Sequence, residues 1–293
     1  SKQQHIMSSV LKRAFQGAVR GGTAGALAMI LQVVLLMWLR TTINWQYKHG
    51  GTLAEAVAAL WAEGGILRFY QGASYALLQG PLSRFGDTAA NEGVRELLHN
   101  SALSVGTVTF CASMAASLWR IVLTPVDTLK TTLQVAGREG VAQLRQKVSQ
   151  FGFWTLYDGA LGNMGANLVG HYPWFVVNNQ LEQIIPPWDN KIVRRAFIGF
   201  CSSVVSDCCS NGVRVIKVYK QTSEIPLGYM EAIAMLLEES GMGFVVRGLG
   251  VKILANALSG ILFSVLWKMI MEKMDARPKN MDATTTSDSS KQK

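Results

Sequence analysis

The stretch Thr124–Gln134, with the sequence TPVDTLKTTLQ, follows an apolar run and is the most informative part of the chain. Pro125 lacks the N–H of a helix hydrogen bond and kinks a helix that contains it. Asp127 and Lys130 lie three residues apart on one helix face, and Gln134 follows one turn later. At the end of a membrane-length helix, this kink would turn an acid and a base toward neighbouring helices.

Glycine-ended segments recur along the chain at a nearly constant spacing. Their last residues are Gly72, Gly159 and Gly248, which lie 87 and 89 residues apart. Another glycine precedes each of them by seven residues, at positions 65, 152 and 241. Self-similarity at a fixed period predicts an architecture of repeated units. We expect three repeats, over about residues 12–99, 100–187 and 188–275.

A short amphipathic segment precedes each of these glycine pairs. Apolar residues at i, i+4, i+7 and i+8 define one helix face in the first and third repeats. These residues are Leu53, Val57, Leu60 and Trp61, and Tyr229, Ile233, Leu236 and Leu237, whereas the second repeat keeps Leu144 and Val148.

The composition favours a membrane protein. The chain of 293 residues is 49% hydrophobic and 16% charged. The segment Ala24–Leu39 has one polar side chain, Gln32, and with its flanks reaches the ~20 residues that cross a bilayer. The other long segments carry Gly, Ser, Asn and single charges, which suits helices around a wet cavity. The predicted fold is an all-α membrane protein with six transmembrane helices in three pseudo-symmetric repeats, each with a short amphipathic surface helix.

Helix boundaries follow from glycines, prolines and polar turns. We expect long helices over about residues 12–46, 72–98, 104–135, 160–185, 190–221 and 249–274, the second interrupted by Gly80-Pro81 and the third ended by Gly137. Short helices are expected over about 52–63, 140–149 and 228–239. Residues 1–276 would form a single domain, and the polar tail 277–293 would be disordered.

Charge, cysteines and motifs exclude several other functions. A net charge of +9 without basic runs interleaved with aromatics favours an anionic lipid surface over nucleic acid. The four cysteines lie in apolar segments without metal-type spacing, and the four histidines are far apart. No nucleophile elbow or phosphate-binding loop occurs in the sequence. We therefore expect neither an enzyme nor a metal site or cofactor.

The motif P-x-[D/E]-x-x-[K/R] with a glutamine four residues on, together with the repeats, resembles the mitochondrial carrier family. The resemblance covers nearly the whole chain. It implies a six-helix solute transporter of the mitochondrial inner membrane, with a central cavity closed alternately by matrix-side and cytosolic-side salt-bridge networks. The alternation of long and short connections puts the three short helices on one side and both termini on the other, the intermembrane-space side. Bound cardiolipin and further subunits of a membrane complex are compatible partners.

The resemblance places a matrix gate at four positions in each repeat. The proline position holds Trp38, Pro125 and Gly212, the acid position Arg40, Asp127 and Arg214, the base position Ile43, Lys130 and Lys217, and the glutamine position Tyr47, Gln134 and Gln221. One acid therefore faces four bases, so we expect Asp127 to keep one basic partner, Lys217 or Arg40. The excess positive charge would hold this end ajar or attract an anionic group.

A cytosolic gate is implied near the other helix ends. Its positions hold Glu92, Arg95, Asn179, Glu182 and Lys268. A cross-pairing of Glu182 with Lys268 would give partial closure. Alternatively, these residues are only the polar ends of helices at the headgroup level.

Substrate contacts are implied seven and eight residues after each repeat-ending glycine. These positions hold Gln79, Gly80, Ala166, Asn167, Ala255 and Asn256, and charged or titratable residues at nearby levels are Arg84, His171, Arg120 and Asp207. Uncharged contacts disfavour nucleotides and polycarboxylates. Charges in mid-membrane face the interior, so Arg120 and Asp207 either bind solute or pair with each other as a structural tie.

Two functions remain open on these residues. The first is a transmembrane solute carrier that moves a small polar or zwitterionic metabolite by alternating access. The second is a carrier-fold subunit or scaffold of a larger mitochondrial membrane complex that no longer transports. Polar contact positions favour the first function, and the incomplete gates favour the second.

Overall fold

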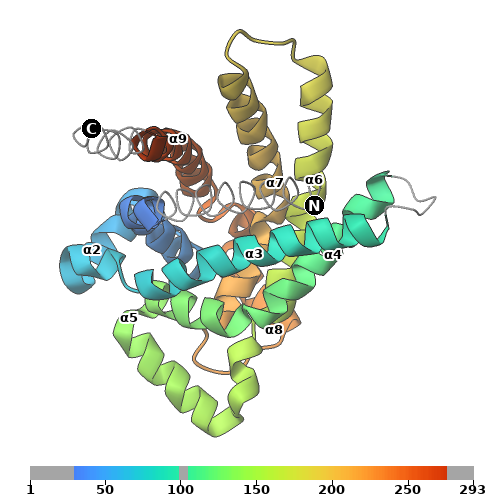
Figure 1. The fold of residues 1–293 in the computed structure, drawn as a ribbon. Helices are drawn as coiled ribbons and strands as arrows, with labels where there is room; N and C mark the ends of the chain where they lie inside the picture. Colours follow the sequence, from blue (N-terminus) through green and yellow to red (C-terminus); the bar gives the residue numbers. More distant parts are fainter. Residues whose placement is uncertain (1–29, 99–104, 276–293) are drawn as a thin grey trace, which may run out of the picture. The chain divides into compact units, whose positions relative to one another are not determined.

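A computed structural model describes residues 30–98 and 105–275, and helices account for nearly all of this part of the chain. The helices can be followed by colour in Figure 1. In chain order they are a helix over residues 30–49, α2 (Leu53–Phe69), α3 (Ala73–Leu97), α4 (Val105–Val122), α5 (Thr124–Phe151), η1 (Phe153–Tyr157), α6 (Ala160–Ile184), α7 (Lys191–Gln221), α8 (Tyr229–Ser240), η2 (Gly241–Val246) and α9 (Leu249–Asp275).

The described residues fall into two units. One comprises residues 33–258, and the other comprises residues 30–32 with 259–275. The candidate site described below lies within the first unit. The predicted tail and the start of the first predicted membrane helix lie outside the described residues.

The junction between α4 and α5 corrects one expected helix. We expected a single kinked helix over 104–135, but α4 ends at Val122 and α5 starts at Thr124. Pro125 occupies the first turn of α5, where its missing N–H costs nothing. The chain turns at Leu123 instead of bending inside a helix, and Asp127 therefore lies in the first turn of a new helix.

Most other predicted boundaries agree with the structure. Gly137 leaves the helical conformation (φ +67°, ψ −155°) and ends the first part of α5, as expected. The expected interruption at Gly80-Pro81 is wrong, because α3 continues through Pro81. The second short helix is the remainder of α5, which reaches Phe151 rather than 149.

Cations cap the carboxyl-terminal ends of three long helices. Arg68 is 2% exposed and donates to the carbonyls of Leu133, Gln134 and Val135 at 3.1, 3.1 and 2.8 Å, where the first part of α5 ends. Arg247 donates to the Lys48 carbonyl at 3.3 Å, and Lys147 donates to the Ser223 carbonyl at 3.3 Å. Arg68 and Arg247 thus pair with carbonyls that a helix end leaves without intrahelical partners, and Lys147 pairs with a carbonyl two residues past the end of α7.

By length and apolar composition, one helical stretch of the described residues qualifies as a membrane span, Tyr229–Leu262. This stretch includes Gly241 and Gly248, both at positive φ, so the chain turns within it. The apolar helix Phe110–Val122 is shorter. Only one stretch of the described residues meets this criterion, and the six predicted spans therefore stay a prediction.

Candidate functional site

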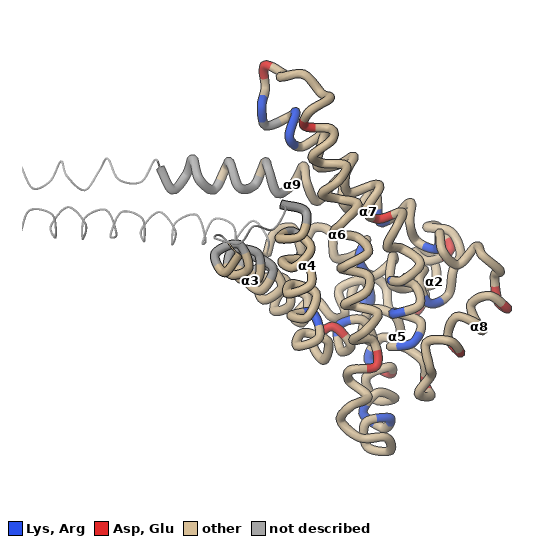
Figure 2. Tube along the Cα trace, turned by 90° about the vertical axis from the view of Figure 1, so that its right-hand side faces the viewer, with Lys and Arg blue, Asp and Glu red and all other residues tan. Residues whose placement is uncertain are grey.

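The first cluster of the candidate site surrounds the Asp127 carboxylate, which is 2% exposed. Lys130 Nζ, on the same face of α5, lies 2.8 Å from Asp127 Oδ1, and Lys217 Nζ of α7 lies 2.5 Å from Oδ2. Gln79 of α3 donates to Asp127 Oδ1 at 2.7 Å and accepts from Lys130 Nζ at 2.5 Å. Figure 2 marks the basic residues of α5 and α7 in blue and their acidic residues in red.

This arrangement corrects the expected matrix gate in one respect. We expected Asp127 to keep one basic partner, but it holds two, Lys130 and Lys217. The two lysines fit side by side because they bind different oxygens of the carboxylate, Lys130 at Oδ1 and Lys217 at Oδ2. The predicted pairing between Asp127 and Lys217 is confirmed.

Neutral side chains join the helix over 30–49, α5 and α7 at the same end. The bonds run from Asn44 Nδ2 to Gln134 Oε1 (2.6 Å), from Gln221 Nε2 to Thr128 Oγ1 (3.1 Å) and from Tyr47 Oη to Asn211 Oδ1 (2.9 Å). Five of these six residues are at most 3% exposed, Asn44 being half-buried. These bonds join the three helices without any balance of charge, and we call the end that they join the closed end. The expectation that excess positive charge holds this end ajar or attracts an anionic group stays a prediction.

The three repeat-ending glycines lie against the three residues at the glutamine position. A Cβ atom at Gly159 would lie 2.4 Å from Gln221 Cδ, and one at Gly248 would lie 3.1 Å from Tyr47 Cε1. A Cβ atom at Gly72 would lie 3.4 Å from Gln134 Cγ and 2.9 Å from the Lys130 carbonyl oxygen. The absence of a side chain at these positions lets the following helix approach the closed end.

A second cluster is built on the Asp207 carboxylate of α7, which is 5% exposed. Lys252 Nζ of α9 lies 3.4 Å from Asp207 Oδ1, and Asn256 Nδ2 donates to Oδ2. The expected ion pair between Asp207 and Arg120 is not found in the described part of the chain, where the partners of Asp207 are Lys252 and Asn256 of α9. The i,i+4 spacing puts Lys252 and Asn256 on one face of α9, so both reach the same carboxylate.

Two predicted substrate contacts of α6 also take part in helix packing. Asn167 Nδ2 donates to Ser117 Oγ at 3.1 Å, and His171 Nδ1 lies 3.3 Å from Ser113 Oγ, both on α4. Ala166 and Ala255 are buried, and Gly80 is half-buried. Whether these residues contact a solute stays a prediction.

The other predicted gate residues are only partly within the described side chains. Arg214 Nε donates to Ser210 Oγ at 3.3 Å on its own helix, and Arg40 is half-buried. Asn179 and Glu182 are exposed. The side chains of Arg84, Glu92, Arg95 and Lys268 lie outside the described set, so the cytosolic gate stays a prediction.

Sequence reasoning missed Lys252, Asn44 and Asn211. Lys252 carried a signal, because it is a single charge in an apolar segment, four residues after Gly248. Asn44 and Asn211 carried none, because neither falls at a position of the repeated motif.

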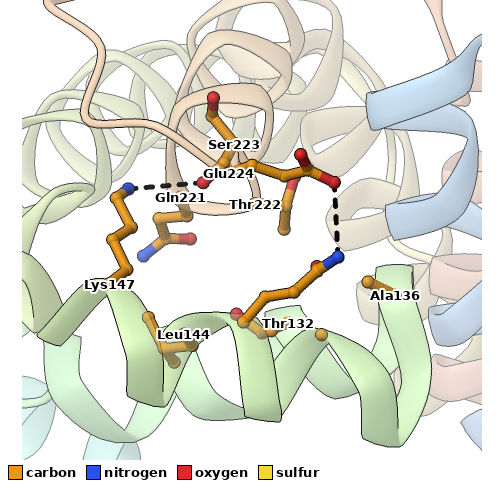
Figure 3. A pocket seen from close by; sticks show the side chains of 10 residues that line it. Thr132, Ala136, Leu144, Lys147, Gln221, Thr222, Ser223 and Glu224 are labelled. Carbon is orange, nitrogen blue, oxygen red and sulfur yellow. Dashed lines mark hydrogen bonds between the residues drawn. The ribbon is translucent and has the colours of Figure 1, made fainter. Parts of the chain in front are cut away.

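A small pocket lies beside the closed end, between the two parts of α5 and the residues after α7 (Figure 3). Gln143 donates to Glu224 and Lys147 donates to the Ser223 carbonyl at its rim, both at 3.3 Å. Its volume is about 10 Å³, roughly that of one water molecule. The pocket is therefore too small to be the solute site.

Metal binding finds no support in the described residues, where no group of three or more His, Cys, Asp and Glu side chains is placed to hold an ion. The four cysteines are not joined in disulfides.

Beyond the predicted end of the first membrane segment, partial burial lowers the pKa of Lys48, and this effect outweighs the opposing attraction of Glu239.

Within residues 33–258, buried charges and neutral hydrogen bonds thus join α5 and α7 to the helix over 30–49. Residues 101–187 match the family model described as mitochondrial carrier protein. The match covers 87 of the 293 residues, and this segment is similar to members of that family. None of the curated proteins compared with the chain matches it.

Proposed function

We propose that this protein is a multi-pass carrier of the mitochondrial inner membrane that moves a small polar or zwitterionic metabolite by alternating access. The observation that carries the proposal is the closure of one end by contacts that can separate. Between α5 and α7 it has one ion pair, Asp127–Lys217, Gln79 of α3 bonds to Asp127 and Lys130, and three further bonds between helices join neutral side chains. Such a layer excludes solvent and still opens at moderate cost, since each neutral bond contributes only ~0.5–1.5 kcal/mol.

The exposed surface supports a membrane location. Large apolar side chains are exposed along several long helices of the described chain, for example Val34 (46%), Phe85 (67%), Leu118 (52%) and Phe197 (46%). Large apolar side chains that are this exposed are costly in water and favourable against lipid. The packing of the three repeat-ending glycines supports three-fold pseudosymmetry. We take the closed end to be the matrix side, with both termini on the intermembrane-space side and the net positive charge facing anionic lipid such as cardiolipin.

Transport in liposomes tests the proposal. Purified protein is reconstituted and offered a panel of labelled amino acids, carboxylates, nucleotides and neutral solutes. Saturable uptake of one class, abolished by Asp127→Asn together with Asn44→Ala, is expected. No uptake of any member would overturn the proposal.

A second candidate is a carrier-fold subunit or scaffold that does not transport. Asp127–Lys217 is the ion pair that the described residues provide between helices at the gate, where the family resemblance implies three. Native gel migration of the protein from mitochondria separates the two candidates. A scaffold migrates with partners and shows no uptake, whereas a carrier shows uptake when it is purified alone.

A further inference from the structure

One face of α7 carries a row of polar side chains toward the closed end. Asp207, Ser210, Arg214 and Lys217 follow at i, i+3, i+7 and i+10, which puts them on one side of the helix. With a rise of ~1.5 Å per residue, the Cα atoms of Asp207 and Arg214 are about 10 Å apart along the helix axis, and the Arg214 side chain reaches back toward Ser210. Asp207 therefore marks one end of a short polar track, and Arg214 and Lys217 mark the other.

The Asp207 carboxylate is the end of this track that a solute can enter most readily. Its ion pair with Lys252 spans 3.4 Å, whereas Lys217 lies 2.5 Å from Asp127. The side chains of Asp207 and Lys252 are 7% and 15% exposed, so both are largely withdrawn from water. Because an uncompensated buried charge is costly, such a pair opens at low cost only when another anion and another cation replace its two partners together.

The charges of the two clusters do not balance. As the described residues give them, the clusters hold four cations (Lys130, Arg214, Lys217, Lys252) and two carboxylates (Asp127, Asp207). Lys130 and Lys217 share Asp127, and Arg214 donates to the neutral Ser210. Cations in a partly desolvated interior repel one another, so an arriving carboxylate is attracted to Lys252 and Arg214. An arriving ammonium has one suitable partner there, Asp207.

We propose that Asp207 and Lys252 form an exchangeable ion pair that selects α-amino acids. The solute ammonium group binds Asp207 with the help of Asn256, and the solute carboxylate takes Lys252 and Arg214. A solute with only one of the two charges would leave either Lys252 or Asp207 buried without a counter-ion. The pair thus favours a zwitterion over a solute that carries only an ammonium or only a carboxylate. Lys252 is then a specificity-determining residue of the carrier function proposed above, on which this inference rests.

Thermal unfolding of the purified full-length protein in detergent tests the proposal without transport. The twenty standard amino acids are added singly, and the best one is compared with its amide, which keeps the ammonium, and its deaminated acid, which keeps the carboxylate. At least one amino acid should raise Tm by ~3 °C or more near saturation. Its amide and its deaminated acid should each give less than half of that shift. No shift with any amino acid, or an equal shift with a half-ligand, would overturn the proposal.

Variants of the pair complete the test. Asp207→Asn should lose the shift given by the amino acid and by its amide, and Lys252→Gln should lose the shift given by the amino acid and by its deaminated acid. Lys252→Arg keeps the charge and should keep the preference for the zwitterion, which provides a folded reference. Unchanged shifts in the first two variants would refute the assignment. Amino acid binding without uptake into liposomes would refute transport and support this binding site. Uptake of an uncharged solute without amino acid binding would support transport and refute this binding site.

Discussion

Replacing Asp127 by asparagine should open the closed end. The carboxylate lies 2.8 Å from Lys130 Nζ and 2.5 Å from Lys217 Nζ. At an effective dielectric constant of ~20, each pair corresponds to about 6 kcal/mol of attraction, most of which offsets the desolvation of the ions. Removing one member of a buried pair costs ~3–5 kcal/mol because the remaining charge stays uncompensated. An asparagine still accepts one hydrogen bond, so we expect a loss of about 3 kcal/mol.

Two measurements test this expected loss of stability. Tm should fall by ~6–12 °C, since 1 kcal/mol corresponds to ~2–4 °C in a chain of this size. A cysteine placed at Thr131, which is 1% exposed, should react with a maleimide roughly 100-fold faster, in a background without the four native cysteines. Both effects arise because Lys130 and Lys217 then repel each other at the interface between α5 and α7.

Two further variants separate the gate from a general loss of charge. Glu55→Gln removes an exposed carboxylate from the capping box of α2 and should cost about 1 kcal/mol or less. Asp127→Asn combined with Lys217→Gln should recover at least half of the lost stability. If Asp127→Asn changed neither Tm nor the labelling rate while Glu55→Gln behaved as expected, the reasoning about a buried shared carboxylate would be refuted.

Three other predictions rest on the same part of the structure. Arg68→Met should lower Tm by ~6–12 °C, because three α5 carbonyls lose a charged donor worth about 3 kcal/mol, whereas the exposed Arg145→Met should change Tm by less than ~2 °C. Gly159→Ala should cost ~1–3 kcal/mol in chemical unfolding, because its Cβ meets Gln221 at φ −99°, a conformation that alanine adopts freely. Gly250→Ala, with open space at its Cβ, should instead be neutral or stabilising. Because the folded state lowers the pKa of Lys48, the unfolded state binds more protons just below pH 10.5, so stability should rise with pH in that window. Lys48→Met should flatten this rise in Tm measured from pH 8 to 10, and an equal slope in both proteins would contradict the assignment.

Local signals predicted most helix ends. Gly137 and the pair Pro186-Pro187 end helices here because glycine and proline act through their own backbone, whereas the single Pro81 lies within α3. A basic partner for Asp127 was also predictable as either Lys217 or Arg40, because both fall at positions of one motif repeated at 87-residue intervals, and the structure selects Lys217. These features depend on neighbouring residues or on a period, and both are visible in a single sequence.

Features that depend on helix rotation were not predictable. Tyr47 meets Asn211, and Asn44 meets Gln134, because two helices far apart in the chain face each other at one level. A sequence gives the face on which a residue lies but not the angle at which that face meets another helix. The partner of Asp207 was missed for this reason, since α9 rather than α4 presents a cation to it.

The cations that cap the helix ends form a closed cycle. Arg68, in the first predicted repeat, donates hydrogen bonds to carbonyls at a helix end in the second repeat. Lys147, in the second repeat, donates to a carbonyl just past a helix end in the third repeat. Arg247, in the third repeat, donates to a carbonyl at a helix end in the first repeat. The last of these bonds joins residues 199 positions apart, so the first helix end is finished only after nearly the whole chain has been synthesised. Folding should therefore be all-or-none rather than repeat by repeat, and two co-expressed fragments divided within 185–190 should be stable only together.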